Sequence, residues 1–380
     1  MRYILLFIAL WAGSLDILAG EPFQDTLQAV SQDTMQQVVE QPEKKLSWLR
    51  RTIRGFSYID ENYVEPQHYN WSVMFQATHT YDYYRIGTTG SESQSIWLSP
   101  TPNVKVGPYF GWRWVFLGYT FDLKRVDVGL KELKQEFDFS IYSAQIGADI
   151  YYRRTGSDYR IRSLDLGRHI NTDALKDEPF DGVSVSITGV NLYYIFNHQR
   201  FSYPAAFAQS TIQKISCGSW MVGVGYTRNS LEFDHNKLQR MIDDRLGPGI
   251  AKLDSGMMFN SVEYFNTSAS VGYAYNWVFK RHWLFCASLS LALAYKRARG
   301  DADDDKTRRF QFDINNINID GIGRFALVYN NMRWYAGASA IVRAYNYRES
   351  RFAANNIFGS LNVYVGYNFG LRSSYKKKRE

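Results

Sequence analysis

The chain has 380 residues, and its 44 basic and 37 acidic side chains give a formal net charge of +7. Aromatic residues make up 16% of the chain and charged residues 21%, while the mean hydropathy is only −0.35. This average excludes a bundle of membrane helices, each of which needs about 20 consecutive apolar residues. The modest positive charge, much of it near 44–54 and 376–379, gives no support to a nucleic-acid partner.

The N-terminal residues 1–20 predict a signal peptide. Arg2 supplies the positive start, and residues 3–12 form an apolar core too short to span a bilayer. Residues 21–57 then predict a periplasmic lead-in. Within it, apolar residues at 46, 49, 53 and 56 recur at helical spacing among lysines and arginines. This pattern fits either a short amphipathic helix at the membrane or a basic linker docked on the rim of a larger domain.

Beyond residue 58, apolar and polar residues alternate in segment after segment. A strand sends successive side chains to opposite faces, so each segment has one apolar and one polar face. Tight and long connections also alternate, as in bacterial outer-membrane barrels whose termini are both periplasmic. The sequence therefore predicts an all-β fold, a transmembrane antiparallel up-and-down β-barrel of twelve strands over 58–372, with a basic periplasmic tail at 373–380. The expected strands are 69–86, 93–109, 112–125, 134–154, 158–166, 183–197, 212–233, 258–279, 282–298, 307–329, 332–347 and 356–371.

The facing of each strand follows from the alternation. In the last strand, Leu361, Val363 and Val365 are expected to face lipid, whereas Asn362 and Gly366 face inward. The same reasoning turns residues 220, 222, 224 and 226 outward, and residues 285, 287, 289, 291, 293 and 295 as well. Two segments change phase, near 143–144 and 188–189, and we expect a β-bulge at each place. A β-rich secreted soluble protein is the alternative to the barrel.

Aromatic residues collect near the expected strand ends, where the aromatic belts of membrane proteins lie. The predicted belt residues are Trp112, Trp277, Trp283, Trp334, Tyr345 and Tyr347.

Several motifs resemble one family. The stretch 58–66 (YIDENYVEP), the stretch 104–114 (VKVGPYFGWRW), the stretch 201–207 (FSYPAAF) and Arg333-Trp334-Tyr335 are similar to an uncharacterised family of Bacteroidetes outer-membrane barrels known as domain of unknown function 4421. The resemblance covers about residues 56–371. It implies the location and the fold, and it carries no activity or catalytic residue.

Charges of both signs are expected in the barrel lumen: Lys105, Asp122, Asp149, Asp320, Arg324 and Arg343. Because charges in a narrow interior must be paired or hydrated, two interpretations stay open. They form either a salt-bridged, side-chain-filled interior or the selectivity lining of a narrow channel for a small polar solute. The segment 201–207, on the periplasmic side, could fold over the lower opening.

No residue is predicted to be catalytic, metal-ligating or cofactor-binding, and no cofactor is expected. His79 lies mid-strand on the lipid-facing side, which would suit an outer-membrane lipase, but no serine is marked as its partner. A histidine of the interfacial belt is the preferred interpretation. Four aspartates at 301–305 could bind Ca²⁺ or bridge lipopolysaccharide phosphates, but their spacing matches no metal loop and basic residues follow.

The two cysteines, Cys217 and Cys286, are both expected to face inward at similar heights with one strand between them. Their Cα atoms would then lie about 9–10 Å apart, beyond the reach of a disulfide. We therefore expect two free thiols.

The sequence thus predicts a monomeric outer-membrane barrel with a side-chain-filled lumen. Its expected function is that of a structural or envelope-binding component, and the sequence does not indicate a more specific role. The alternatives are a narrow channel and a lipid-acting enzyme. Its expected partners are outer-membrane lipid and lipopolysaccharide.

Overall fold

The computed structural model describes most of the chain after its N-terminal region. The described residues are 59–88, 93–112, 115–118, 121–122, 135–154, 158–167, 170–300, 316–348 and 352–376. The predicted signal peptide at 1–20, the lead-in at 21–57 and the aspartate cluster at 301–305 therefore lie outside them.

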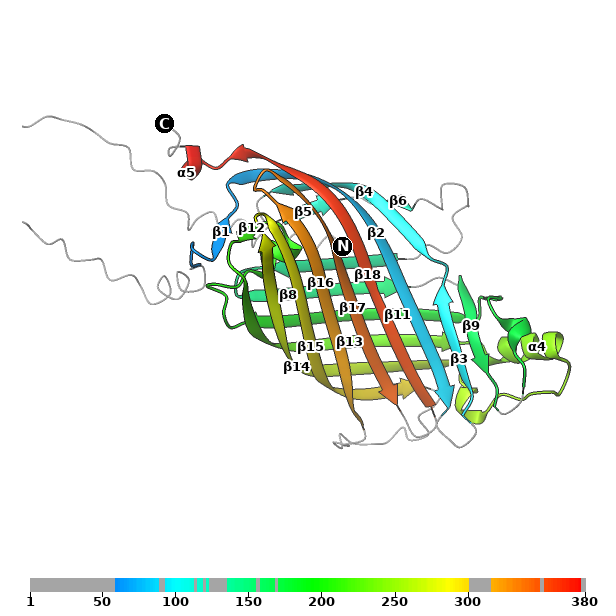
Figure 1. Cartoon of the computed structure of the whole chain (residues 1–380). Coiled ribbons are helices and arrows are strands. Elements are labelled where there is room, and N and C mark those ends of the chain that lie inside the picture. The colour runs from blue at the N-terminus through cyan, green and yellow to red at the C-terminus, as the bar shows by residue number, and fades with distance from the viewer. Residues whose placement is uncertain are drawn as a thin grey trace, which may run out of the picture. The chain divides into compact units, whose positions relative to one another are not determined.

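The described residues form an antiparallel, sheet-dominated all-β fold (Figure 1). Its longest pairing joins the two ends of the chain, since β2 (Tyr69–Thr88) pairs with β18 (Phe352–Leu371) from Tyr69 opposite Leu371 to Thr88 opposite Phe352. From β18 the sheet continues through consecutive strands back toward the middle of the chain. These are β17 (Trp334–Arg348), β16 (Ile317–Asn330), β15 (Trp283–Gly300), β14 (Ser261–Lys280), β13 (Cys217–Phe233) and β11 (Val183–Ile195).

The predicted fourth strand, 134–154, is a hairpin. It consists of β7 (Gln135–Tyr142) and β8 (Ile146–Arg154), which pair with each other, and β8 pairs with β11. The expected β-bulge at 143–144 was wrong, because these residues belong to a tight turn in which the Ser143 amide donates to the Ile146 carbonyl over 3.1 Å. The turn lacks the Asn-Gly or Asp-Gly pair that marks a two-residue hairpin.

Other strands also differ from the prediction. The second is split into β3 (Ser95–Pro100) and β4 (Asn103–Trp112), and β4 pairs with β5 (Val115–Gly118) and β6 (Phe121–Asp122). The fifth, β9 (Tyr159–Asp165), pairs with β3 and β10 (Pro179–Phe180) rather than following β8 around the sheet. The alternation of apolar and polar residues therefore predicted that these strands exist, but it did not predict which strands they pair with.

One end of the sheet, here called the cap end, carries a folded cap. It contains β3, β9, β10, α4 (His235–Leu246) and two short 3₁₀ helices, η1 (Asp173–Leu175) and η2 (Ser255–Met257). Helix α4 begins where the Asp234 side chain accepts a hydrogen bond from the Lys237 amide, and it ends before Gly247, whose φ of 111° suits glycine. Lys237 also pairs with Asp181, and its hydrogen bond lowers the pKa of that carboxyl.

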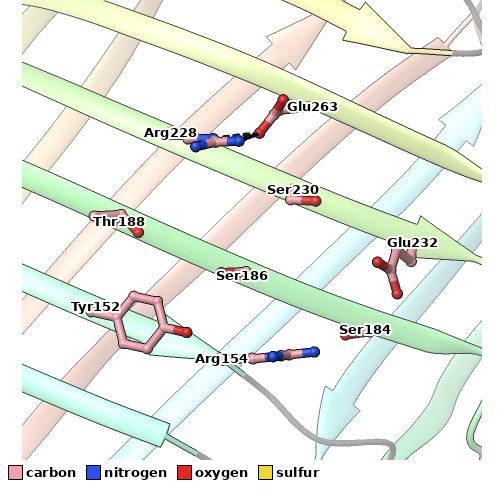
Figure 2. Close-up of a pocket in the computed structure, with 9 residues that line it drawn as sticks. All are labelled: Tyr152, Arg154, Ser184, Ser186, Thr188, Arg228, Ser230, Glu232 and Glu263. Atoms are coloured by element: carbon pink, nitrogen blue, oxygen red, sulfur yellow. Dashed lines mark hydrogen bonds and ion pairs between the residues drawn. The ribbon is translucent and has the colours of Figure 1, made fainter.

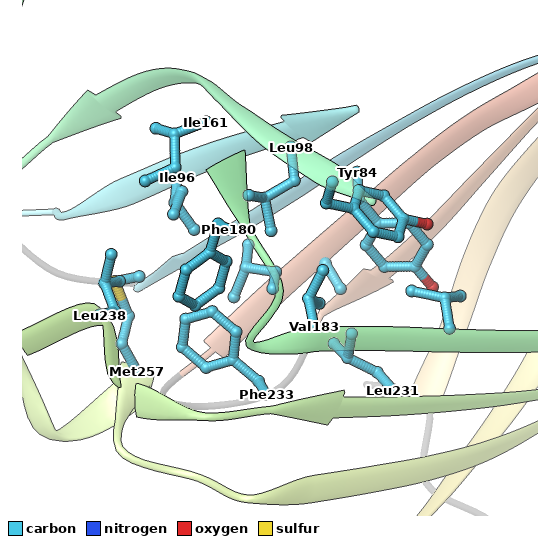
Figure 3. Close-up of a cluster of buried hydrophobic side chains, with 14 of the residues drawn as sticks. Tyr84, Ile96, Leu98, Ile161, Phe180, Val183, Leu231, Phe233, Leu238 and Met257 are labelled. Atoms are coloured by element: carbon cyan, nitrogen blue, oxygen red, sulfur yellow. The ribbon is translucent and has the colours of Figure 1, made fainter. Parts of the chain in front are cut away.

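The cap packs as a continuous apolar core against one side of the sheet (Figure 3). Leu238 and Ile242 lie one helical turn apart on α4 and are both fully buried. Ile96 and Ile161 come from β3 and β9, while Val183 and Leu231 come from the cap ends of β11 and β13. The side of the sheet that carries this core is called the inner side below.

The opposite end, here called the turn end, has the short connections between β7 and β8, β14 and β15, and β16 and β17. Here the inner side holds the short helix α3 (Tyr203–Phe207), capped by Ser202, and a two-stranded antiparallel sheet of β1 (Val64–Pro66) and β12 (Thr211–Gln213). The Tyr203 hydroxyl donates to Ser288 over 2.8 Å, and Tyr203 is fully buried. The expectation that the 201–207 segment folds over this end agrees with its packing.

Helices are few. Among the described residues, no helix is both long and apolar enough to cross a membrane. A last short helix, α5 (Ser373–Lys376), follows β18.

Candidate functional site: an apolar belt, a charged interior and a polar groove

The outer side of the sheet carries large exposed apolar side chains at alternate positions. Leu289, Leu291 and Leu293 of β15 are 63%, 65% and 63% exposed, whereas Ala292 and Ala294, on the other side of the same strand, are buried. On β13, β15 and β18, the residues predicted to face lipid lie on the exposed outer side of the sheet. Further exposed residues of this apolar belt are Val73, Phe75, Ile150, Val190, Leu192, Trp220, Val222, Val224, Val271, Leu361, Val363 and Val365.

Aromatic side chains border the belt at the turn end. Trp112, Trp277 and Trp334 are exposed there, and Trp283 is half-buried against Tyr329 with ring centroids 5.4 Å apart. These four predicted belt residues face outward, as expected. They are joined by residues that the prediction did not single out as belt members: Trp71, Phe110, Trp220, Tyr273, Phe279, Tyr367 and Phe369.

The prediction was wrong for Tyr345 and Tyr347. Both are buried on the inner side, within the core that the cap covers. The Tyr345 hydroxyl lies 2.7 Å from that of Tyr151, and the Tyr347 ring stacks on Tyr264 at 4.7 Å. In the sequence their odd positions near a strand end fit an aromatic belt equally well. The cap, which the alternation does not reveal, gives them an apolar inner environment.

Ionic side chains are buried on the inner side, where the sequence predicted a charged lumen. Asp149 of β8 pairs with Arg324 of β16, and Asp320 of β16 pairs with Lys296 of β15 over 2.7 Å. All four side chains are at most 3% exposed. Asp149 also accepts a hydrogen bond from Ser140, and Asp320 accepts one from Asn266. These contacts satisfy the requirement that buried charges be paired.

Arginine–aromatic contacts extend this network. The Arg343 guanidinium lies 4.7 Å from the Tyr151 ring and 5.7 Å from Phe358, and Arg153 lies over the same Phe358 ring at 5.1 Å. Such stacking suits the weakly hydrated guanidinium of arginine. Arg153 and Lys296 were missed by the sequence prediction. Both continue the inward parity of their strands, two residues after Tyr151 and Ala294, so extending the alternation would have found them.

Lys105 and Asp122, the other two predicted lumen residues, are opposite each other in the pairing of β4 with β6. Lys105 is half-buried and has an interaction partner. The side chain of Asp122 lies outside the part of the chain that the structure describes.

The outer side of β11 changes from polar to apolar between Thr188 and Val190, and its inner side changes from apolar to polar over the same residues. On the turn-end side of this point, Val190 and Leu192 face outward, and Asn191 faces inward. On the cap-end side, the outward residues are Ser184, Ser186 and Thr188, and the inward residues are buried and apolar. The expected β-bulge at 188–189 was wrong, because β11 keeps an unbroken register with both β8 and β13. The phase change in the sequence marks a change of surroundings.

The same transition occurs on the neighbouring strands. On β13, the outward series of Val222, Val224 and Tyr226 gives way to Arg228, Ser230 and Glu232. On β15, Leu293 and the half-buried Tyr295 are followed by the exposed Arg297. The apolar belt therefore ends at one level on adjacent strands.

Immediately beyond this level, the outer side has a polar groove of about 300 Å³ (Figure 2). Strands β8, β11, β13 and β14 contribute its lining, and Arg154, Ser186, Ser230 and Glu263 form one row across them in the strand register. A second row, nearer the belt, runs from Tyr152 through Thr188 to Arg228. The remaining lining residues are Ser184 and Glu232.

Charges in the groove are arranged unevenly. Arg228 forms an ion pair with Glu263 and lies 5.5 Å from the Phe265 ring. Arg154 and Glu232 are exposed, and among the described residues neither forms a side-chain hydrogen bond or ion pair. The groove therefore offers one held guanidinium, one open guanidinium, one open carboxylate and five hydroxyl groups, one of them the phenol of Tyr152, to a ligand. In the sequence, the phase change in β11 is the one feature noted above that indicates the position of this groove.

His79 lies on the outer side of β2, opposite Leu361 of β18 and Val104 of β4. It is half-buried. No three His, Cys, Asp or Glu residues in the described ranges are placed to hold a metal ion. Both cysteines are free, as predicted, and Cys286 is fully buried.

Several solved structures are similar to this chain at a low level. The outer membrane protease OmpT from Escherichia coli is 7% identical with a TM-score of 0.34, and the match covers 79% of this chain and 97% of that chain. The toluene transporter TodX of P. putida is 9% identical with a TM-score of 0.26, covering 79% and 91%. The translocator domain of autotransporter NalP from Neisseria meningitidis is 11% identical with a TM-score of 0.27, covering 84% and 93%.

All three TM-scores are below 0.5. No curated protein matches the chain. A family model described as "Domain of unknown function (DUF4421)" matches residues 58–369, which include every strand described above except the last two residues of β18. The chain therefore belongs to the DUF4421 family.

Proposed function

We propose that this protein is an outer-membrane β-barrel of a Gram-negative bacterium, acting as a structural or envelope-binding component with a side-chain-filled interior. The apolar belt carries this proposal. From Phe285 to Tyr295 there are ten residue steps, which correspond to roughly 34 Å along a strand. A strand tilt of about 40–45° reduces this to roughly 25 Å, the height of the apolar band of outer-membrane barrels.

The proposed barrel has twelve membrane strands. These are β2, β4, the β5–β6 segment, β7, β8, β11 and the six strands from β13 to β18. The pairing of β2 with β18 joins the first and last of them, and closure pairs the β5–β6 segment with β7. The turn end is periplasmic and the cap end faces the outside, because outer-membrane barrels have short periplasmic turns and longer outer loops.

The filled interior distinguishes this proposal from a narrow channel for a small polar solute. The inner side is packed by the cap at one end and by α3 at the other, and paired charges lie between them. A carboxylate held by a guanidinium leaves little field for an ion in transit. The interior groups thus serve to hold the strands together.

Planar-bilayer recording tests the filled interior. Purified protein, reconstituted beside a known general porin as positive control, should insert without producing conductance steps. Regular steps would contradict the filled interior and support the narrow channel. Insertion is verified separately by heat-modifiable gel migration, since a folded barrel in detergent should migrate differently before and after boiling. Migration unaffected by boiling, together with extraction by buffer alone, would contradict the barrel itself.

A further inference from the structure

The polar groove on the outer side takes no part in the interior packing, although the ion pair of Arg228 and Glu263 links β13 and β14 within it. It lies on the surface that the proposed function exposes to lipid, directly beyond the apolar belt toward the cap end (Figure 2). Thr188 of β11 and Arg228 of β13 are paired in register, and Val190 and Tyr226, the last belt residues, are the next outward pair. The groove therefore begins one outward residue past the belt, about 7 Å along the strand.

We propose that this groove binds the phosphorylated sugar headgroup of a lipid in the outer leaflet of the membrane. The inference rests on the proposed function, because that function sets the belt in the hydrocarbon layer. The groove then lies at the level of the headgroups, where the phosphates and the first sugars of a glycolipid are found.

The arginines select a phosphate. Arg154 is open, and Arg228 is held in place by Glu263 and the Phe265 ring. Arg297 of β15, opposite Phe265 in register, adds an exposed guanidinium next to the groove. A guanidinium offers two parallel N–H donors that match two phosphate oxygens, and it remains charged at every physiological pH. Arg228 and Arg297 lie at one level, and Arg154 lies one outward residue nearer the cap end. These three guanidiniums, on strands β8, β13 and β15, suit more than one phosphate group.

The other lining groups select a sugar. Ser184, Ser186, Thr188 and Ser230 present hydroxyls that both donate and accept hydrogen bonds. The open carboxylate of Glu232 can accept hydrogen bonds from sugar hydroxyls, and Tyr152 contributes an aromatic ring. The row from Arg154 to Glu263 crosses four strands, or about 14 Å. That width exceeds the needs of a single ethanolamine phosphate and fits a headgroup with a sugar ring.

Native mass spectrometry of the protein released from nanodiscs tests the proposal. The nanodiscs contain phosphatidylethanolamine with a minor fraction of bisphosphorylated lipid A, or of lipid A from which both phosphates have been removed. The wild-type protein should retain one bisphosphorylated lipid A. The Arg154→Gln/Arg228→Gln protein should retain at least about tenfold less, because it lacks both guanidiniums that pair with the phosphates. The Arg154→Lys/Arg228→Lys protein should retain an intermediate amount, because lysine keeps the charge and loses the fork.

Arg281→Gln is the matched control, because Arg281 is an exposed arginine in the turn between β14 and β15 at the other end of the strands. It should behave as wild type. Equal retention by the double glutamine variant, equal retention of the dephosphorylated lipid, or preferential retention of phosphatidylethanolamine would each overturn the headgroup site while leaving the barrel intact. Failure of the wild-type protein to enter nanodiscs would overturn the barrel, and the headgroup site with it.

Discussion

Arg324 and Asp149 form a buried ion pair although their strands, β16 and β8, are not neighbours in the sheet. Four strands, β15, β14, β13 and β11, separate them in the order of the sheet. The sheet must therefore curve enough for its inner side to face itself. The ion pair links β16 and β8 across the interior. The Arg324 guanidinium carbon also lies 5.2 Å from the centroid of the Tyr193 ring.

Removing one member of this ion pair should strongly lower the free energy of unfolding. Arg324→Met leaves the Asp149 carboxylate buried without its partner, which should destabilise the folded protein by about 3–5 kcal/mol. Arg324→Met combined with Asp149→Asn removes both charges and should cost less than Arg324→Met alone. Urea unfolding in detergent, followed by tryptophan fluorescence, gives both values. If the double variant is no more stable than Arg324→Met, the ion pair is not a coupled unit.

The reversal within β11 predicts two opposite responses to the same substitution on the same strand. Leu192→Arg places a charge in the apolar belt, one outward residue inside its cap-end edge, and should cost about 1–3 kcal/mol, between the midplane and interface values. Ser184→Arg lies beyond the belt on the same side and should be tolerated. The yield of heat-modifiable protein in the membrane measures both. Similar yields would mean that Leu192 does not face lipid.

The buried position of Tyr345 can be separated from a place in the aromatic belt. Tyr345→Phe removes its hydrogen bond with Tyr151, and should cost about 0.5–1.5 kcal/mol. The control is Tyr83→Phe, since Tyr83 is 47% exposed on the outer side and should lose much less. Thermal unfolding midpoints in the same detergent compare the two. A larger decrease in the unfolding midpoint for Tyr83→Phe than for Tyr345→Phe would contradict the buried position of Tyr345.

The free thiols should survive oxidation. Cys217 and Cys286 both lie opposite Asn276, on either side of β14. Two strand spacings separate them by about 9.6 Å, whereas a disulfide needs Cα atoms about 4.4–6.8 Å apart. Alkylation without reduction, followed by mass spectrometry, should label both, with Cys217 reacting faster because Cys286 is fully buried. A Cys217–Cys286 disulfide would contradict the order β13-β14-β15.

The sequence predicted well wherever a strand alternates between an exposed apolar side and an interior side without a change of surroundings. The facing of Leu291 and Val363 followed directly, because their neighbours alternate without interruption. The prediction was wrong where the surroundings change along a strand. In β11, the cap makes the inner side apolar and water makes the outer side polar, so a continuous strand has the sequence pattern of a bulge.

The interior contacts could not be predicted for a different reason. Alternation gives the side to which Asp149 and Arg324 point, but their meeting depends on the curvature of the sheet and on the order of strands between them. The polar groove likewise requires the register of four strands. Arg154 and Glu263 are 109 positions apart in the chain, and only the pairing of β8, β11, β13 and β14 brings them into one row.

Collisional accessibility of spin labels along β13 tests the central claim, that the apolar belt lies in a membrane and ends between Tyr226 and Arg228. Single cysteines are introduced at positions 220 to 232 in a Cys217→Ser/Cys286→Ala background and reconstituted in lipid. Labels at positions 222 and 224 should be reached by oxygen and protected from a water-soluble nickel chelate. Labels at positions 230 and 232 should show the reverse. Equal exposure to the nickel chelate at 224 and 230 would mean that no membrane boundary lies between Tyr226 and Arg228.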